Sequence, residues 1–172
     1  MDLNKFINFE KSNLIVVARS VSEEIGSEPI ISELSKRFKI AYFYFLDIKE
    51  KNYNKNNIFI KLREFYSIEK LRQKCIRLKD KYNIKFIVID DIELLRCEKA
   101  RTECKSIFEE QKETAKLLKE LSEELQINIL VISNISSRFY QRKSDDDLLL
   151  YLENETLRKC ADVIIFLYKE KK

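Results

Sequence analysis

Residues 86–95 read Phe-Ile-Val-Ile-Asp-Asp-Ile-Glu-Leu-Leu, so that four apolar residues run directly into two aspartates. A short, continuous run of β-branched and aromatic residues is typical of a strand that is buried on both faces, as in a parallel sheet. Runs of the same character occupy residues 14–18, 40–46, 58–60, 127–132 and 163–168. Together these runs predict a mainly parallel sheet.

Helical periods separate several of the runs. One helix is predicted from a 3-4-3-4 spacing of Ile68, Leu71, Cys75, Leu78 and Tyr82. A longer helix is expected over about residues 103–125, with one face formed by Phe108, Gln111, Ala115, Leu118 and Leu125. Strands that alternate with helices indicate βαβ units and an α/β fold. Because no internal boundary is visible, we expect a single domain over residues 1–172.

Composition excludes several classes of site. The chain has one glycine, one proline, four cysteines and no histidine, and its formal net charge is +4. A His-based acid–base site or His-ligated metal is therefore impossible, and without a CxxC pair no metal site is expected. The net charge is too small to indicate nucleic-acid binding by itself. The polar start, and the lack of an apolar run of roughly 18 residues, favour a cytoplasmic protein without a membrane span.

Polar residues follow several of the predicted strands, at the edge where open α/β sheets bind ligands. The run at residues 40–46 is followed by Asp47, and the run at 86–89 is followed by Asp90-Asp91. The run at 127–132 is followed by Ser133-Asn134-Ile-Ser136. In order and spacing, about residues 11–172 resemble the RecA-like C-terminal motor domain of bacterial replicative DNA helicases of the DnaB type. The resemblance implies a P-loop NTPase-type sandwich, with helices flanking a mainly parallel sheet. Relative to that family we expect the chain to be shortened at both ends.

The stretch at the family's phosphate loop departs from its pattern. Such a loop reads G-x-x-x-x-G-K-[ST], in which backbone N–H groups and the lysine hold phosphates and the hydroxyl holds Mg²⁺. The resemblance places Glu23, Glu24 and Ile25 at the last three positions, where the carboxylates repel phosphate. We therefore expect no cofactor; ATP and Mg²⁺ would require a rearranged loop. The favoured alternative is an ordinary strand-to-helix connection, with Ser20 or Ser22 capping the helix.

Three further site positions are implied by the same resemblance. Asp90 stands where the family has its magnesium-organising carboxylate, and Asp47 stands where it has a longer, catalytic Glu. We expect both catalytic positions to be inactive. Asn134 stands at the sensor position, usually Gln, which reads the γ-phosphate. An aspartate that follows a buried strand also commonly caps the next turn, and this structural alternative stays open.

Residues 137–147 contain the candidate DNA contacts. Arg138, Arg142 and Lys143 accompany two aromatic residues where the family's loop faces the central channel and touches single-stranded DNA. Basic side chains beside aromatic ones suit phosphate contact and base stacking. Three aspartates, residues 145–147, follow directly and oppose DNA. An ordinary solvated loop is the alternative.

Three functions remain open from the sequence. The favoured one is a DnaB-helicase-like domain, linked to DNA replication, that has lost ATP hydrolysis and is not an enzyme. It would act as a binding or regulatory module on a replicative helicase or another replication protein. The second is an ATP-dependent DNA helicase or ATPase with an unorthodox phosphate loop. The third is a small single-stranded-DNA-binding protein that uses residues 137–143.

Overall fold

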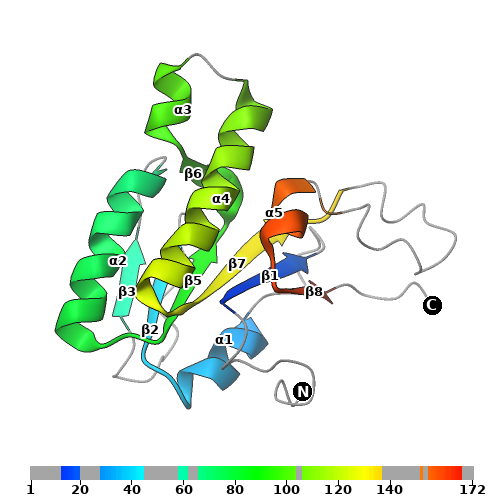
Figure 1. Ribbon diagram of the computed structural model, residues 1–172. Coiled ribbons are helices and arrows are strands. Elements are labelled where there is room, and N and C mark those ends of the chain that lie inside the picture. The colour runs from blue at the N-terminus through cyan, green and yellow to red at the C-terminus, as the bar shows by residue number, and fades with distance from the viewer. Residues whose placement is uncertain are drawn as a thin grey trace, which may run out of the picture.

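The computed structural model describes residues 13–19, 28–44, 58–61, 66–103, 106–136, 152 and 155–167. Six of its strands form one sheet in the order β3-β2-β5-β7-β1-β8 (Figure 1). Their bounds are β1 Leu14–Arg19, β2 Ile40–Tyr44, β3 Ile58–Lys61, β5 Phe86–Asp90, β7 Asn128–Asn134 and β8 Val163–Leu167. Every neighbouring pair in this sheet is parallel, which confirms the expected parallel sheet.

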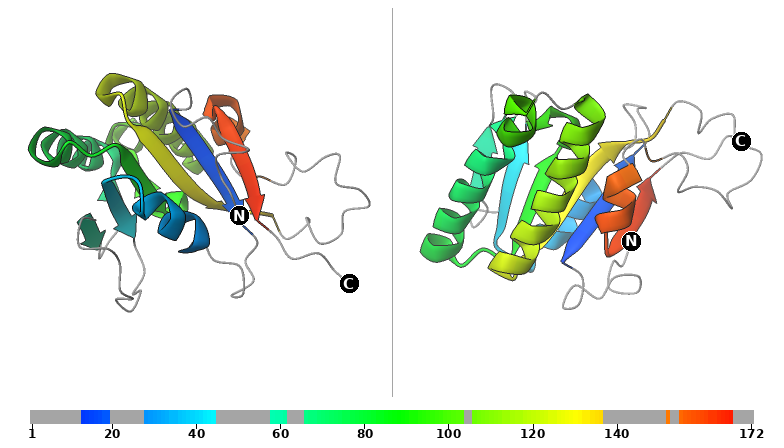
Figure 2. Two further views of the ribbon diagram at one scale, coloured as in Figure 1. Left: turned by 90° about the horizontal axis from the view of Figure 1, so that it is seen from below. Right: turned by 45° about the horizontal axis from the view of Figure 1, so that its top comes forward.

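Helices cover both faces of the sheet (Figure 2). The helices α2 (Ile68–Tyr82), α4 (Ile107–Leu125) and α5 (Glu155–Cys160) pack on one face, and α1 (Glu28–Ser35) packs on the other. Along β1, Leu14 and Val16 belong to the first core, whereas Ile15 and Val17 belong to the second. Because successive strand residues point to opposite faces, a sheet with two covered faces needs continuous apolar runs.

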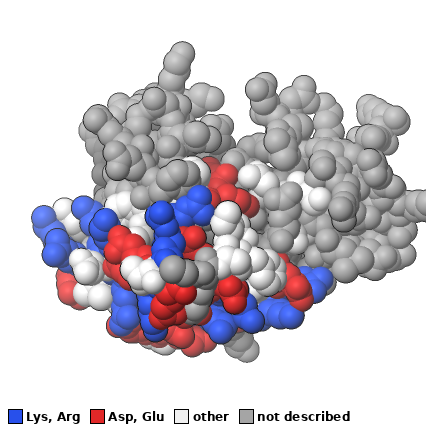
Figure 3. Space-filling model, turned by 90° about the horizontal axis from the view of Figure 1, so that it is seen from above, with Lys and Arg blue, Asp and Glu red and all other residues white. Residues whose placement is uncertain are grey.

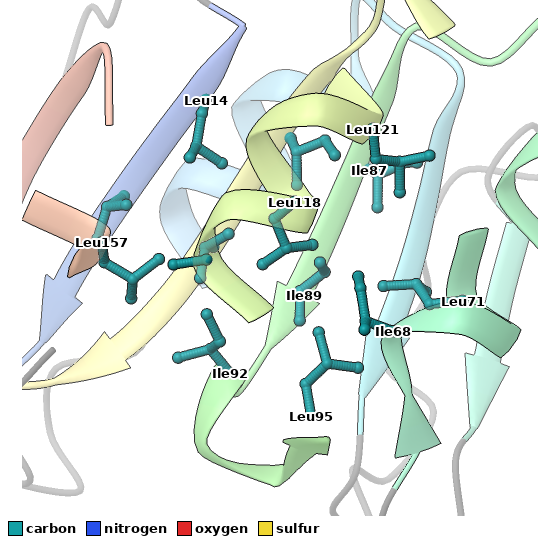
Figure 4. Close-up of a cluster of buried hydrophobic side chains, with 14 of the residues drawn as sticks. Leu14, Ile68, Leu71, Ile87, Ile89, Ile92, Leu95, Leu118, Leu121 and Leu157 are labelled. Carbon is teal, nitrogen blue, oxygen red and sulfur yellow. The ribbon is translucent and has the colours of Figure 1, made fainter. Parts of the chain in front are cut away.

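The larger core lies between the sheet and the pair α2 and α4. Figure 4 shows Leu118 and Leu121 of α4 lying over Ile87 and Ile89 of β5. Leu118 is 0% exposed. On the opposite face, the rings of Phe38 and Phe86 pack with their centroids 5.3 Å apart. The core thus supports the middle strands whose ends carry the candidate site.

Capping interactions define the ends of the two long helices. The hydroxyl of Ser67 accepts a hydrogen bond from the backbone N–H of Lys70 at the start of α2. At the start of α4, Ser106 and Glu109 form a reciprocal capping box. Both helices end in a left-handed residue, Asn83 and Gln126 respectively. Each cap satisfies backbone groups that the helix itself leaves unpaired.

Two sequence-based expectations about these helices are wrong. The longer helix begins at Ile107 rather than near residue 103, because Ser106 caps it and residues 98–102 form a separate short helix. Phe108 is 57% exposed and Tyr82 is 40% exposed, so neither belongs to a buried face. Four short elements were also not predicted: β4 (Tyr66–Ser67), η2 (Ile92–Leu94), β6 (Leu95–Arg96) and α3 (Glu98–Thr102).

None of the helices in the described ranges has the length and apolarity needed to span a bilayer.

A carboxylate anchors the start of β1. Asp162 accepts hydrogen bonds from the backbone N–H groups of Asn13 (2.9 Å) and Leu14 (2.7 Å), and Lys119 of α4 donates to it at 2.7 Å. Burial by itself raises the pKa of Asp162, but these donors outweigh it and hold the pKa below its ordinary value. The stabilisation is therefore present at neutral pH and is lost as the pH falls through the lowered pKa.

Replacing Asp162 by alanine should lower the free energy of unfolding at pH 7 by about 1–3 kcal/mol, because two N–H groups of the chain and one ammonium lose their acceptor. Urea denaturation at pH 7 and in acid measures the effect. The exposed Asp80→Ala change on α2 is the matched control and should cost less than about 0.5 kcal/mol. If Asp162→Ala lowers the free energy of unfolding as much in acid as at pH 7, the stabilisation does not come from the ionised carboxylate.

Candidate functional site

The candidate site lies at the edge of the sheet where the central parallel strands end. The strand β7 lies between β1 and β5, and all three run in the same direction. Arg19 of β1 is in register with Asn134, and Asp90 of β5 is in register with Ile132. The structure therefore brings two predicted site residues, Asp90 and Asn134, to the same edge.

A tight turn follows β5 and directs the next residues toward β7. The peptide bond between Asp90 and Asp91 is cis. Oδ1 of Asp91 accepts a hydrogen bond from the backbone N–H of Glu93 at 2.9 Å and caps η2. The buried Ile92 attaches the turn to the larger core. The cap of this turn is thus Asp91, the residue after Asp90, for which turn capping was the structural alternative.

Glu93 joins this turn to the end of β7, and it was not among the residues expected at the site. Its Oε1 accepts hydrogen bonds from the hydroxyl of Ser133 at 2.7 Å and from the backbone N–H of Asn134 at 3.1 Å. Its Oε2 is buried and has no hydrogen-bond partner in the described part of the chain. The available sequence signal was an acidic residue inside an apolar segment, Ile-Glu-Leu-Leu, directly after a predicted strand end.

Glu93 lies in an environment that favours its neutral form. Burial, aided by the hydrogen-bond contact and negative charge of Asp91, raises the pKa of Glu93 to about 8, while the donors Ser133 and Asn134 oppose the rise. The carboxyl therefore carries a proton at neutral pH. Because Oε1 already accepts two hydrogen bonds, the proton belongs on Oε2, and the protonated side chain can donate to Asp91.

The side chain of Asn134 is turned toward Asp91. Its Nδ2 donates to Oδ2 of Asp91 across 3.4 Å, a long hydrogen bond. The backbone N–H of the same residue is held by Glu93 at 3.1 Å. Both the main chain and the amide of Asn134 are thereby engaged by acidic residues of the turn after β5.

The remaining predicted site positions fall outside the described residues. They are Glu23, Glu24, Ile25, Asp47, Arg138, Arg142 and Lys143. Within the described ranges, no group of three or more Asp, Glu or Cys side chains is arranged to hold a metal ion. In the view of Figure 3, acidic and basic side chains intermingle over the described surface.

Sequence comparison identifies the family. The model of the "DnaB-like helicase C terminal domain" matches residues 2–172. The chain belongs to this family. The replicative DNA helicase DnaB of Geobacillus stearothermophilus is 28% identical over 104 residues, which are 60% of this chain and 22% of that helicase. DnaB of Mycobacterium leprae is 33% identical over 100 residues, 58% of this chain and 16% of the relative. The match of this DnaB-like domain thus spans about a fifth of these relatives.

Solved structures show the same fold. A structure described as a DnaB-like replicative helicase and its interactions with primase matches this DnaB-like domain with a TM-score of 0.75 and 17% identity, over 92% of this chain and 47% of that one. The crystal structure of the RadB recombinase matches with a TM-score of 0.59 and 16% identity, over 92% of this chain and 76% of that one. Both matches confirm the predicted RecA-like α/β fold.

Proposed function

We propose that this DnaB-like domain does not hydrolyse ATP and serves as a binding module in DNA replication. The observation that carries the proposal is the network at the ends of β5 and β7, in which Asp91 and Glu93 engage Asn134. To read a γ-phosphate, the Asn134 amide would have to leave Asp91. A triphosphate would also approach Asp91, and a carboxylate there disfavours an anion.

The sequence adds support from the residues expected around a nucleotide. Glu23 and Glu24 replace the glycine and lysine of the phosphate loop, and Ile25 replaces the metal-binding hydroxyl. We expect Asp47, one methylene shorter than the family's catalytic Glu, to be too short to position a water molecule. Each change removes a different part of phosphoryl-transfer chemistry, so restoring one of them alone is not expected to restore hydrolysis.

The proposed partners are a replicative helicase or another replication protein. The relatives that the chain matches are named replicative DNA helicases, and one similar structure concerns a helicase with its primase. The retained sheet and helices support docking on a replication protein, because docking does not require an intact phosphate loop. Single-stranded DNA, at residues 137–143, is a further proposed partner.

A titration of a fluorescent ATP analogue with Mg²⁺ tests the proposal. We expect no saturable binding up to millimolar nucleotide, and no release of phosphate above the buffer rate, with or without single-stranded DNA. Tight, Mg²⁺-dependent binding would overturn the proposal. DNA-stimulated phosphate release that collapses in Asp90→Ala, but not in the exposed control Asp80→Ala, would establish the ATPase alternative instead.

A further inference from the structure

A row of basic side chains runs along one flank of α2. Lys70, Lys74, Arg77 and Lys81 are all exposed, and they follow one another at intervals of four, three and four residues. This spacing aligns them on a single side of a helix. At a rise of 1.5 Å per residue, the row is about 16 Å long. We name these four residues the α2 basic stripe.

The stripe lies on the flank of α2 that faces away from α4. The buried side of the helix consists of Ile68, Leu71, Cys75 and Leu78. Glu69 and Arg72, on another side, line a groove of about 210 Å³ between α2 and α4. In Figures 1 and 2, α2 is the outermost helix of its layer, toward the β3 side of the sheet. The stripe is therefore a surface separate from both the core and the groove.

The basic residues of the stripe form no ion pair within α2, which the structure describes in full, unlike basic residues on other helices. Ion pairs one turn apart on α1, α4 and α5 join Glu33 to Lys36, Lys119 to Glu123, and Glu155 to Lys159. No acidic residue shares the stripe. Among ion pairs between described residues, the stripe takes part in one, in which Lys70 pairs with Glu98 of α3 at 3.2 Å.

Like charges four residues apart, such as Lys70 with Lys74 and Arg77 with Lys81, destabilise an isolated helix. The helix dipole favours cations in the last turn, which accounts for Lys81 but not for Lys70 or Lys74. An external anion would relieve the repulsion along the whole row.

Positive charge continues beyond the end of α2. The backbone N–H of Lys85 donates to the carbonyl of Lys39 at 3.1 Å, which brings these two exposed lysines together. Burial and the charge of Lys85 both lower the pKa of Lys79. The exposed Asp80 is the single acidic residue between Lys70 and Lys85. At the C-terminal end of α2, the stripe is thus followed by further exposed lysines, Lys39 and Lys85.

We propose that the α2 basic stripe binds the phosphate backbone of a nucleic-acid strand, at a site distinct from residues 137–143. Cations evenly spaced along a line match the regular charges of a phosphodiester backbone. Contact with the backbone alone is independent of base sequence. The site does not require nucleotide binding at the sheet edge, so the ATP titration and the following experiment can fail independently.

Fluorescence anisotropy of a labelled 20-nucleotide oligothymidylate, measured over a series of salt concentrations, tests the site. The stripe variant is Lys74→Gln/Arg77→Gln/Lys81→Gln, and its matched control removes three exposed lysines elsewhere, Lys112→Gln/Lys116→Gln/Lys159→Gln. We expect the stripe variant to bind about tenfold more weakly at 0.1 M salt. Its log–log salt slope should fall by about 2, because each phosphate contact of a single strand contributes about 0.7. The control should change affinity less than about twofold.

Four results would overturn the proposal. The first is that the wild-type chain does not bind the oligonucleotide at low salt, and the second is that both triple variants lose the same affinity. The third is that only Arg138→Ala/Arg142→Ala loses affinity. The fourth is that a polyglutamate peptide binds more tightly than the oligonucleotide. The second result indicates net charge alone, and the fourth indicates an acidic protein partner. Circular dichroism establishes that each variant retains its helices.

Discussion

At pH 8, Glu93→Gln is expected to raise the free energy of unfolding by about 2–5 kcal/mol over wild type. Burial and the neighbouring Asp91 raise the pKa of Glu93 from 4.5 to about 8. The folded chain therefore holds a proton that the unfolded chain releases above pH 4.5. The contribution of Glu93 to the free energy of unfolding is greatest below pH 4.5. This contribution is lost as the pH rises through about 8. Each pKa unit corresponds to about 1.4 kcal/mol, so the upper limit is near 5 kcal/mol.

Glutamine suits the same position because it is neutral at every pH in this range. Its Oε1 can accept the hydrogen bonds that Ser133 and Asn134 now donate to Glu93. Its Nε2 takes the place of the buried Oε2 and can donate to Asp91 without a bound proton. The amide therefore satisfies the network that the carboxyl satisfies only when protonated.

Urea denaturation between pH 4 and pH 9 tests this prediction. The advantage of Glu93→Gln should be small near pH 4 and should grow with pH, as the wild-type curve falls and the variant curve stays flatter. The exposed Glu120→Gln change on α4 is the control and should run parallel to wild type. A difference between Glu93→Gln and wild type that is the same at all pH values would contradict the assignment.

Replacing Leu118 by alanine is expected to lower the free energy of unfolding by about 2–5 kcal/mol, because it removes methyl groups from a fully buried site and leaves a cavity. The site lies where α4 faces the middle of the sheet (Figure 4). A loss of this size is a large part of the roughly 5–15 kcal/mol typical of folded domains, so a clearly lower melting temperature is expected.

The matched control for this core substitution is Ile107→Ala, on the same helix. Ile107 is 66% exposed and lies in the first turn of α4, so its truncation should change stability by less than about 0.5 kcal/mol. Thermal and urea denaturation of both variants give the comparison. Equal losses for the two would contradict the burial assigned to Leu118.

The sheet and α2 could be predicted from sequence because their burial leaves a local pattern. A strand covered on both faces needs every residue to be apolar, and β5 ends at Asp90, where its apolar run stops. The start of α4 could not be predicted from periodicity, since Phe108 fits the helical repeat and yet is exposed. At five residues, α3 is too short to show a period.

The candidate site was only partly visible in the sequence. Asp90 and Asn134 were singled out because each lies at the end of an apolar run and matches a family position. Glu93 was missed because its partner Ser133 lies 40 residues away, and no local pattern encodes that hydrogen bond. The assignments of Glu23, Glu24 and the other positions outside the described residues remain predictions.

The place of β1 in the sheet has a consequence for the order of events during synthesis. This strand pairs with β7, through Leu14 and Ile129, and with β8, through Ile15 and Val163. A nascent chain that has left the ribosome only as far as residue 125 therefore exposes β1 with both of its edges unpaired. Such distant pairing is slow and leaves apolar edges open to aggregation. The strand β1 thus stays without its two neighbours in the sheet until the residues of β7 and β8 have been synthesised.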